Sequence, residues 1–183
     1  MNKTVLIPLA DGFEELEAVS MMDILVRAGA QVTRAGLVSK TITASGGTVL
    51  IADCLLADVI AHSFDLIALP GGLPGADNLM NSDLLNTILL THNSLHRPIA
   101  AICAAPKILI NNGLAKHQVI TGYPGSLKGQ NTENIKITES DIEDSGLIFT
   151  SRGPGTALDF SLFLVEKLYG TETRNRVKAG LAG

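Results

Sequence analysis

Cys103 is the candidate nucleophile of this chain, because small residues flank it between an apolar run and a helical stretch. A short strand at 99–102 and a helix from Lys107 would place the thiol on a tight turn, the geometry of a nucleophile elbow. The N–H groups and the positive dipole end of that helix would favour the thiolate. A buried cysteine without a chemical role is the alternative interpretation.

Two further turns contain residues that could serve the same site. Gly71 and Gly72 follow an apolar run at 64–69, and glycine lets a backbone N–H approach a developing oxyanion. A plain tight turn is the alternative there. Glu14 and Glu17 share a helix face at three-residue spacing, and a carboxyl near a thiolate would keep its proton, because like charges raise its pKa. Such a carboxyl could move protons for a substrate, although helix capping also explains these acids.

The histidines are His62, His92, His96 and His117. None of the four follows a predicted strand end, so the triad of a Cys–His protease or amidase is hard to assemble. His92 and His96 could share a helix face as metal ligands, but no carboxylate accompanies them and a solvated face is the better interpretation. Cys54 and Cys103 are both expected to be free thiols. The P-loop pattern GxxxxGK[ST] is missing from the sequence, and we expect neither a cofactor nor a metal.

Alternating apolar runs and amphipathic stretches must position these residues. Strands are predicted at 4–8, 31–37, 64–69, 99–102 and 119–120, and helices at 14–28, 82–95, 107–112 and 156–169. A hairpin is predicted within 41–51, and strands at 135–137 and 147–150 could pair with each other. This alternation predicts an α/β fold with a mostly parallel central sheet and helices on both faces. Ligands of such folds bind at the carboxyl ends of the strands, where the candidate turns meet.

Length and composition narrow the class of protein. The 183 residues fit a single domain over 1–183, and aliphatic residues dominate while aromatic residues make up 4%, as expected for strands buried on both faces. The net charge of −4, without a basic cluster, argues against nucleic acid as a partner. No apolar segment is long enough for a signal peptide or a membrane span, so we expect a cytoplasmic protein without a membrane partner.

Several motifs together resemble the DJ-1/PfpI superfamily, in its DJ-1 and YajL (ThiJ) branch, over essentially the whole chain. They are GFEELEAV at 12–19, LPGG at 69–72, AAICAAP at 100–106 and TSRGPGTALDF at 150–160. The resemblance implies a flavodoxin-like, Rossmann-type three-layer sandwich with a small β-hairpin insertion, assembled as a homodimer.

The resemblance also implies roles for individual residues. Cys103 would be the nucleophilic and oxidisable cysteine, and Glu17 the acid that hydrogen-bonds it. The backbone N–H groups of Gly72 and Ala104 would form the oxyanion site, beside Gly71. The residues implied at the dimer interface are Arg27 and the turn from Arg152 through Pro154 to Gly155.

One position departs from the pattern of DJ-1. Where DJ-1 carries a histidine in the active-site segment, this chain has Tyr123. A phenol is a much weaker base than imidazole near neutral pH, which leaves Glu17 as the proton shuttle. The YajL branch likewise has an aromatic residue there. Cys54 does not align with the second cysteine familiar in DJ-1, and no role is transferred to it.

The leading hypothesis is cofactor-free chemistry on a small reactive carbonyl such as methylglyoxal or glyoxal. Cys103 would form a hemithioacetal and Glu17 would move the proton that leads to a hydroxy acid, a glyoxalase III-like or deglycase-like activity. The alternative is an oxidative-stress sensor or chaperone-like protein in which peroxide oxidises Cys103 to a sulfinate. An intracellular protease or amidase lacks its histidine, and a role in thiamine biosynthesis lacks a phosphate- or thiazole-binding feature.

Overall fold

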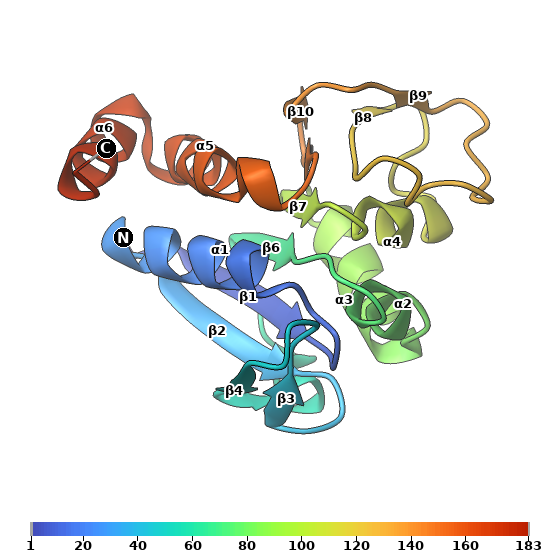
Figure 1. Ribbon diagram of the computed structural model, residues 1–183, viewed down its shortest axis with the longest axis horizontal. Helices are drawn as coiled ribbons and strands as arrows, with labels where there is room; N and C mark the ends of the chain where they lie inside the picture. Colours follow the sequence, from blue (N-terminus) through green and yellow to red (C-terminus); the bar gives the residue numbers. More distant parts are fainter. Residues whose placement is uncertain (1, 183) are drawn as a thin grey trace.

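The central sheet consists of short aliphatic strands, most of them buried on both faces. The computed structural model describes residues 2–182 (Figure 1). The strands of the sheet are β1 (Thr4–Leu9), β2 (Gln31–Gly36), β5 (Cys54–Leu55), β6 (Leu66–Leu69), β7 (Ile99–Ile102), β10 (Ile142–Ser145) and β11 (Ile148–Ser151). Their order is β10-β11-β7-β6-β1-β2-β5. Within residues 2–182 every pairing in this sheet is parallel except that of β10 with β11.

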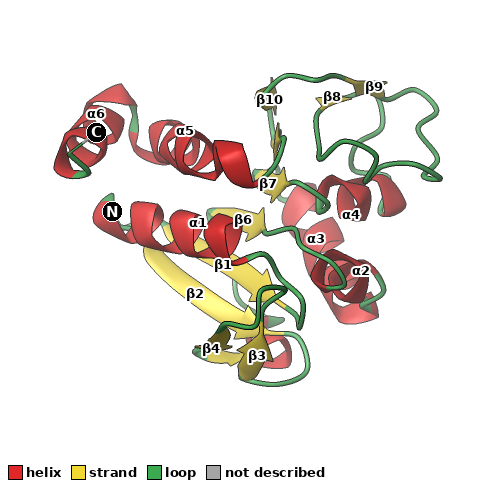
Figure 2. Cartoon of the chain, in the orientation of Figure 1, coloured by secondary structure: helices red, strands yellow, loops and turns green. Residues whose placement is uncertain are grey.

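Helices cover both faces of the sheet (Figure 2). They are α1 (Glu15–Arg27), α2 (Gly75–Met80), α3 (Asp83–Ser94), α4 (Pro106–Asn111), α5 (Ala157–Tyr169) and α6 (Thr171–Gly180), with 3-10 turns η1 (Leu56–Val59) and η2 (Pro154–Thr156). Alternate side chains of β1 enter different cores: Val5 and Ile7 pack on the side of α1, α5 and α6, and Leu6 on the side of α2, α3 and α4. The predicted flavodoxin-like sandwich is confirmed, because β2-β1-β6-β7-β11 is the flavodoxin strand order.

The predicted hairpin is present as β3 (Thr41–Thr43) and β4 (Val49–Ile51). The predicted pairing of 135–137 with 147–150 is wrong. β9 (Lys136–Ile137) instead pairs in parallel with β8 (Val119–Ile120), whereas β11 lies between β7 and β10. The reason is burial: all four residues of β11 are buried and need a strand on each side, but both residues of β9 are exposed.

Sequence patterns did not predict β5, η1, α2, β10 or α6. These elements are short or polar, so hydrophobic periodicity is weak in them. In α6 the buried residue is Val177, and β10 is a half-exposed edge strand with the sequence Ile-Glu-Asp-Ser. No helix within residues 2–182 is long and apolar enough to cross a membrane.

Candidate active site

Three turns at the carboxyl edge of the sheet converge on Cys103. They follow β1, β6 and β7, and hydrogen bonds join the first two: Glu14 N–H donates to the Gly71 carbonyl at 3.0 Å, and Gly71 N–H donates to Glu17 Oε2 at 2.8 Å. The turn after β7 carries Cys103 itself. The convergence predicted from the ends of parallel strands is therefore present.

The backbone of Cys103 adopts a conformation that side chains rarely tolerate. Its φ is +64°, in the left-handed region, which costs a non-glycine residue about 1 kcal/mol or more. Two main-chain hydrogen bonds hold this turn: Cys103 N–H donates to Ser151 O at 2.9 Å, and Tyr123 N–H donates to Cys103 O at 2.8 Å. Ser126 Oγ also donates to Cys103 O, at 3.2 Å. The strained turn leaves the residue 8% exposed.

Glu17 is a fully buried acid with one unused oxygen. Its exposed fraction is 0%, and Oε2 accepts the hydrogen bond from Gly71. Among the atoms of residues 2–182, Oε1 finds no hydrogen-bond donor. Burial raises the pKa of Glu17 to about 7, and the nearby Cys103 thiol and the Gly71 N–H offset part of this rise. Near neutral pH this carboxyl can therefore both give and take a proton.

Gly71 allows the acid and the thiol to approach each other. A Cβ on Gly71 would lie 2.8 Å from Cys103 Cβ, 2.8 Å from Glu17 Oε2 and 2.9 Å from Ala104 N. Real Cβ atoms essentially never come this close to other heavy atoms. The close packing of these groups thus requires glycine at position 71.

The backbone N–H group of Ala104, just after Cys103, favours the thiolate, but other effects outweigh it and the pKa of the thiol is raised. Burial is the largest effect on the thiol, and together with the nearby Glu17 carboxyl it raises the pKa of Cys103 to about 12. Hydrogen bonds from the backbone N–H groups of Gly72 and Ala104 lower the pKa without cancelling that rise. Cys103 therefore holds its proton until a base such as Glu17 accepts it.

Tyr123 and Arg152 lie next to the Cys103 turn. Both line a surface pocket of about 390 Å³ next to the Cys103 turn. The Tyr123 side chain is 52% exposed and packs over Gly153, where an added Cβ would be 3.1 Å from Tyr123 Cδ2. Arg152 Nη1 donates to Glu139 O at 2.9 Å. The half-buried Pro154 begins η2 directly after this segment.

Arg27 is remote from the thiol along its own helix. It stands in the last turn of α1, ten residues beyond Glu17, which corresponds to about 15 Å along the helix axis. Its Nε pairs with Asp23 Oδ2 at 2.6 Å, and both side chains are about half exposed.

The remaining candidates take structural positions. The expectation that His92 lies on a solvated face is wrong: it is buried, and its Nε2 hydrogen-bonds Pro98 O at 2.9 Å, a contact with the segment before β7 that periodicity alone did not show. Cys54 and Cys103 are free thiols, and Cys54 Sγ lies 4.0 Å from Arg34 O. In the described part of the chain no group of three His, Cys, Asp or Glu side chains is arranged to hold a metal ion.

Sequence reasoning missed Ser126 and Ser151, which hold the backbone of Cys103. Ser126 lies in a stretch expected to be irregular, and Ser151 contributes its carbonyl, a group that every residue has. No motif could have identified them. The capping role of Glu14 could have been predicted from the sequence, because an acid at the start of a helix is a common N-cap. Its Oε2 accepts from Glu17 N at 2.7 Å.

Comparison with known proteins places this geometry in a family. The sequence profile of the DJ-1/PfpI family matches residues 3–167. The chain belongs to the DJ-1/PfpI family. This confirms the resemblance stated from the motifs.

Several DJ-1/PfpI relatives are similar over nearly the whole chain. Protein DJ-1 homolog A of Arabidopsis thaliana is 42% identical over 97% of this chain, which spans 46% of that longer protein. Protein dj-1beta of Drosophila melanogaster is 39% identical, with 99% of this chain and 97% of that protein aligned. A Caenorhabditis elegans protein named glutathione-independent glyoxalase DJR-1.2 is 36% identical over 93% of this chain and 90% of its own length.

Solved DJ-1 structures have the same fold. The crystal structure of Drosophila melanogaster DJ-1beta matches with a TM-score of 0.95 and 39% identity, covering 100% of this chain and 98% of that one. The structure described as Toxoplasma gondii DJ-1, oxidized, matches with a TM-score of 0.93 and 37% identity over 98% of both chains. These two neighbours share the flavodoxin-like architecture of this DJ-1/PfpI member.

Proposed function

We propose that this DJ-1/PfpI member is a cytoplasmic, cofactor-free enzyme that converts a small reactive carbonyl, such as methylglyoxal or glyoxal, to a hydroxy acid. The observation that carries the proposal is the packing of Cys103 and Glu17 against Gly71, with the Glu17 pKa raised to about 7. A carboxyl of that pKa can act as base and acid in one cycle at neutral pH. The name of the nematode relative, a glutathione-independent glyoxalase, supports this choice of substrate class.

The proposed cycle needs only water as a second reactant. The Glu17 carboxylate accepts the Cys103 proton as sulfur adds to the aldehyde carbon of methylglyoxal, and the carbonyl oxygen becomes the hydroxyl of a hemithioacetal. The N–H groups of Gly72 and Ala104, which hydrogen-bond the sulfur side chain, stabilise the developing oxyanion. Glu17 then moves the proton of the former aldehyde carbon to the neighbouring carbon. The hydroxyl proton of the hemithioacetal passes to the ketone oxygen, so that the first carbon becomes the thioester carbonyl and the second carries the hydroxyl group. Water hydrolyses the resulting thioester, which releases lactate and restores the thiol.

The test is formation of lactate from methylglyoxal without glutathione. Cys103→Ser and Glu17→Gln are expected to lose at least 100-fold in kcat/KM, because each removes a group that acts on the reacting atoms. Cys54→Ser is the matched control, since Cys54 lies outside the site, and it is expected to retain full activity. Undiminished lactate formation by folded Cys103→Ser would refute the proposal. The same assay on aminocarbinols formed from methylglyoxal and an amine tests the deglycase variant.

A second candidate is a peroxide sensor, as predicted from the resemblance. The observation that favours it is the set of groups around the sulfur: two backbone N–H groups and the Glu17 carboxyl could hydrogen-bond the oxygens of a sulfinate. The Toxoplasma relative is itself described as oxidized. Intact mass after mild peroxide treatment tests this role. Addition of two oxygens at Cys103, absent in Cys103→Ser, supports it, whereas an unreactive thiol contradicts it.

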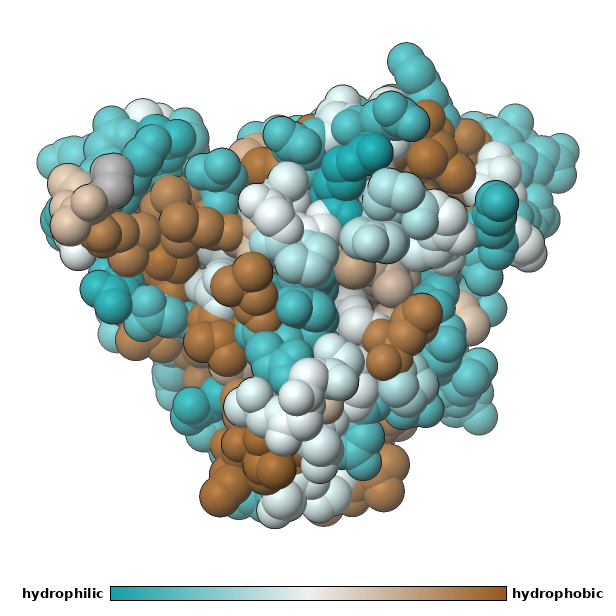
Figure 3. Space-filling view, viewed as in Figure 1, coloured by the Kyte–Doolittle hydropathy of each residue, from teal (hydrophilic) through white to brown (hydrophobic). Residues whose placement is uncertain are grey.

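We further propose that the chain works as a homodimer. Large apolar side chains stand exposed on the outer side of α1 and on the neighbouring hairpin: Leu16, Val19, Val26, Val49 and Ile51. Figure 3 shows brown areas over α1 and α5 and over the β3–β4 hairpin. An apolar area of this kind on a small protein is typical of an interface. Arg27 ends the same helix, in agreement with its implied place near the partner, and Arg152 and Pro154 are proposed to lie toward the same interface.

A further inference from the structure

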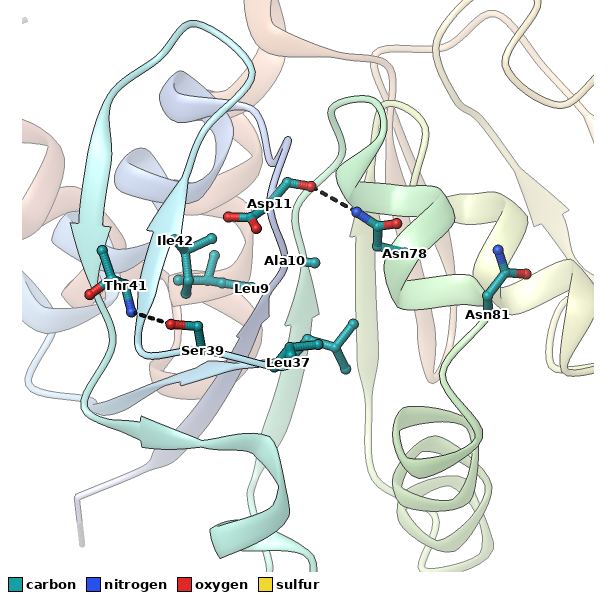
Figure 4. A pocket seen from close by; sticks show the side chains of 10 residues that line it. Leu9, Ala10, Asp11, Leu37, Ser39, Thr41, Ile42, Asn78 and Asn81 are labelled. Carbon is teal, nitrogen blue, oxygen red and sulfur yellow. Dashed lines mark hydrogen bonds between the residues drawn. The ribbon is translucent and has the colours of Figure 1, made fainter.

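A second pocket of about 390 Å³ opens at the carboxyl ends of β1 and β2 (Figure 4). It is lined by Leu9, Ala10, Asp11, Leu37, Val38, Ser39, Thr41, Ile42, Asn78 and Asn81. In flavodoxin-like folds ligands bind outside the carboxyl ends of the strands, the edge of the sheet at which this pocket lies. The volume falls in the range typical of small-molecule sites. Position and size both fit a ligand site.

The pocket has an apolar floor and a polar rim. The apolar surface that a ligand can reach belongs to the half-buried Leu37 and the exposed Val38, whereas Leu9 and Ile42 are buried at the floor. Figure 4 shows Asp11 and Asn78 on one side of the opening and Ser39 and Thr41 on the other. The rim can therefore hydrogen-bond one edge of a ligand whose other part lies against the apolar surface.

Existing hydrogen bonds orient the rim groups and leave part of their capacity available. Asp11 Oδ1 accepts from Thr43 N at 2.8 Å, so the carboxylate is fixed while Oδ2 remains to accept. Asn78 Nδ2 donates to Asp11 O at 3.0 Å, which leaves the Asn78 Oδ1 acceptor. Ser39 Oγ accepts from Thr41 N at 3.1 Å and keeps its own proton to donate. Fixed acceptors and donors side by side match hydroxyl groups, which both donate and accept.

The charge of the lining selects against anions. Its ionisable residue is Asp11, and none of the residues that line the pocket is Lys, Arg or His. A phosphate or carboxylate would face the Asp11 carboxylate without a compensating cation, at a cost in affinity. A neutral ligand avoids this electrostatic cost.

We propose that this pocket binds a small uncharged ligand that carries ring hydroxyl groups beside a flat apolar part, the chemistry of a nucleoside. The flat part lies against Leu37 and Val38, and the hydroxyl groups bond Asp11 and the rim amides. The pocket is separate from the thiol: Asp11 faces it from the start of the turn after β1, and Glu17 faces Cys103 from α1. Binding therefore does not depend on the proposed carbonyl chemistry.

Isothermal titration calorimetry of the full chain with adenosine tests the proposal. Measurement in the Cys103→Ser protein keeps it independent of the thiol. One saturable site is expected, and adenosine 5′-monophosphate is expected to bind about tenfold more weakly because of its charge. Asp11→Ala removes a charged acceptor and should weaken adenosine binding about tenfold. Asn81→Ala should weaken it a few fold, and Asp159→Ala, an exposed acid on α5, is the matched control and should not.

Each outcome decides the matter. Asp11→Ala also loses the bond to Thr43, whereas the Asn81 side chain caps nothing and its removal leaves the fold intact, so the second variant guards against a folding artefact. Absence of saturable heat with millimolar adenosine and guanosine overturns the proposal. Equal affinity for the nucleoside and its monophosphate overturns the charge argument and with it the ligand class. Unchanged binding by both Asp11→Ala and Asn81→Ala places the ligand elsewhere and overturns the site.

Discussion

At the scale of the residue, Glu17 has an ionisation equilibrium that folding displaces strongly. Its carboxyl is removed from water and receives one backbone hydrogen bond, so the protonated form is favoured and the pKa rises to about 7. This displacement must affect stability, because a group with different pKa values in the folded and unfolded chain links folding to pH.

Stability relative to Glu17→Gln should therefore depend on pH. Below the unfolded value of 4.5 the acid is protonated in both states, and no penalty applies. As pH rises from there through about 7, the unfolded chain ionises first and the native state loses about 3 kcal/mol. Urea unfolding of both proteins at pH 5, 6, 7 and 8 measures this difference. Parallel curves for the two proteins would show that the Glu17 pKa is not raised.

Gly71→Ala should damage the site directly. The new methyl group would overlap the positions of Cys103 Cβ and Glu17 Oε2, so the turns must separate, at a cost of about 2 kcal/mol in unfolding free energy. Alkylation of Cys103 by iodoacetamide should change by more than fivefold. Gly155→Ala is the control, because a Cβ there meets no heavy atom within 4 Å. Equal behaviour of the two variants would contradict the packing argument.

At the scale of the element, the start of α1 is coupled to the site and the start of α3 is not. Glu14 caps α1 through Glu17 N–H, and Ser82 caps α3 through Leu85 N–H at 3.2 Å. Glu14→Ala and Ser82→Ala should each cost about 1 kcal/mol in unfolding free energy. Only Glu14→Ala should also change the pH dependence of Cys103 alkylation, because it frees the turn that holds Glu17. A comparable change in Ser82→Ala would mean that stability alone controls the thiol.

The sequence alone predicted the bounds of those helices in which the hydrophobic pattern extends over the whole element. The predicted bounds of α3 and α5 differ from the observed ones by one residue at most at each end, and the Ser82 cap is present. The turn of Cys103 was also predictable from its small neighbours. Its pKa was not, because the expectation weighed the helix dipole and could not weigh burial, which depends on the packing of distant segments. The partner of β11 was missed for the same reason.

At the scale of the whole molecule, the exposed apolar side chains of α1 and the hairpin are expected to join two copies. Val19→Asp and Ile51→Asp place charges in that area and should convert a dimer to a monomer in sedimentation velocity at micromolar concentration. Leu90→Asp, equally exposed on α3 in the other helix layer, is the matched control and should leave the mass unchanged. A monomeric unmodified protein at that concentration would refute the assembly.

The two edges of the central sheet determine how readily other chains can add to it and aggregate. At one edge β5 is only two residues long. At the other, β10 carries Glu143 and Asp144, and Ser145 Oγ both accepts from Val119 N and donates to Val119 O. A short strand and a charged, covered strand are poor templates for the backbone of another chain. Protein oxidised at Cys103 should thus stay dispersed, without seeding fibrous aggregates.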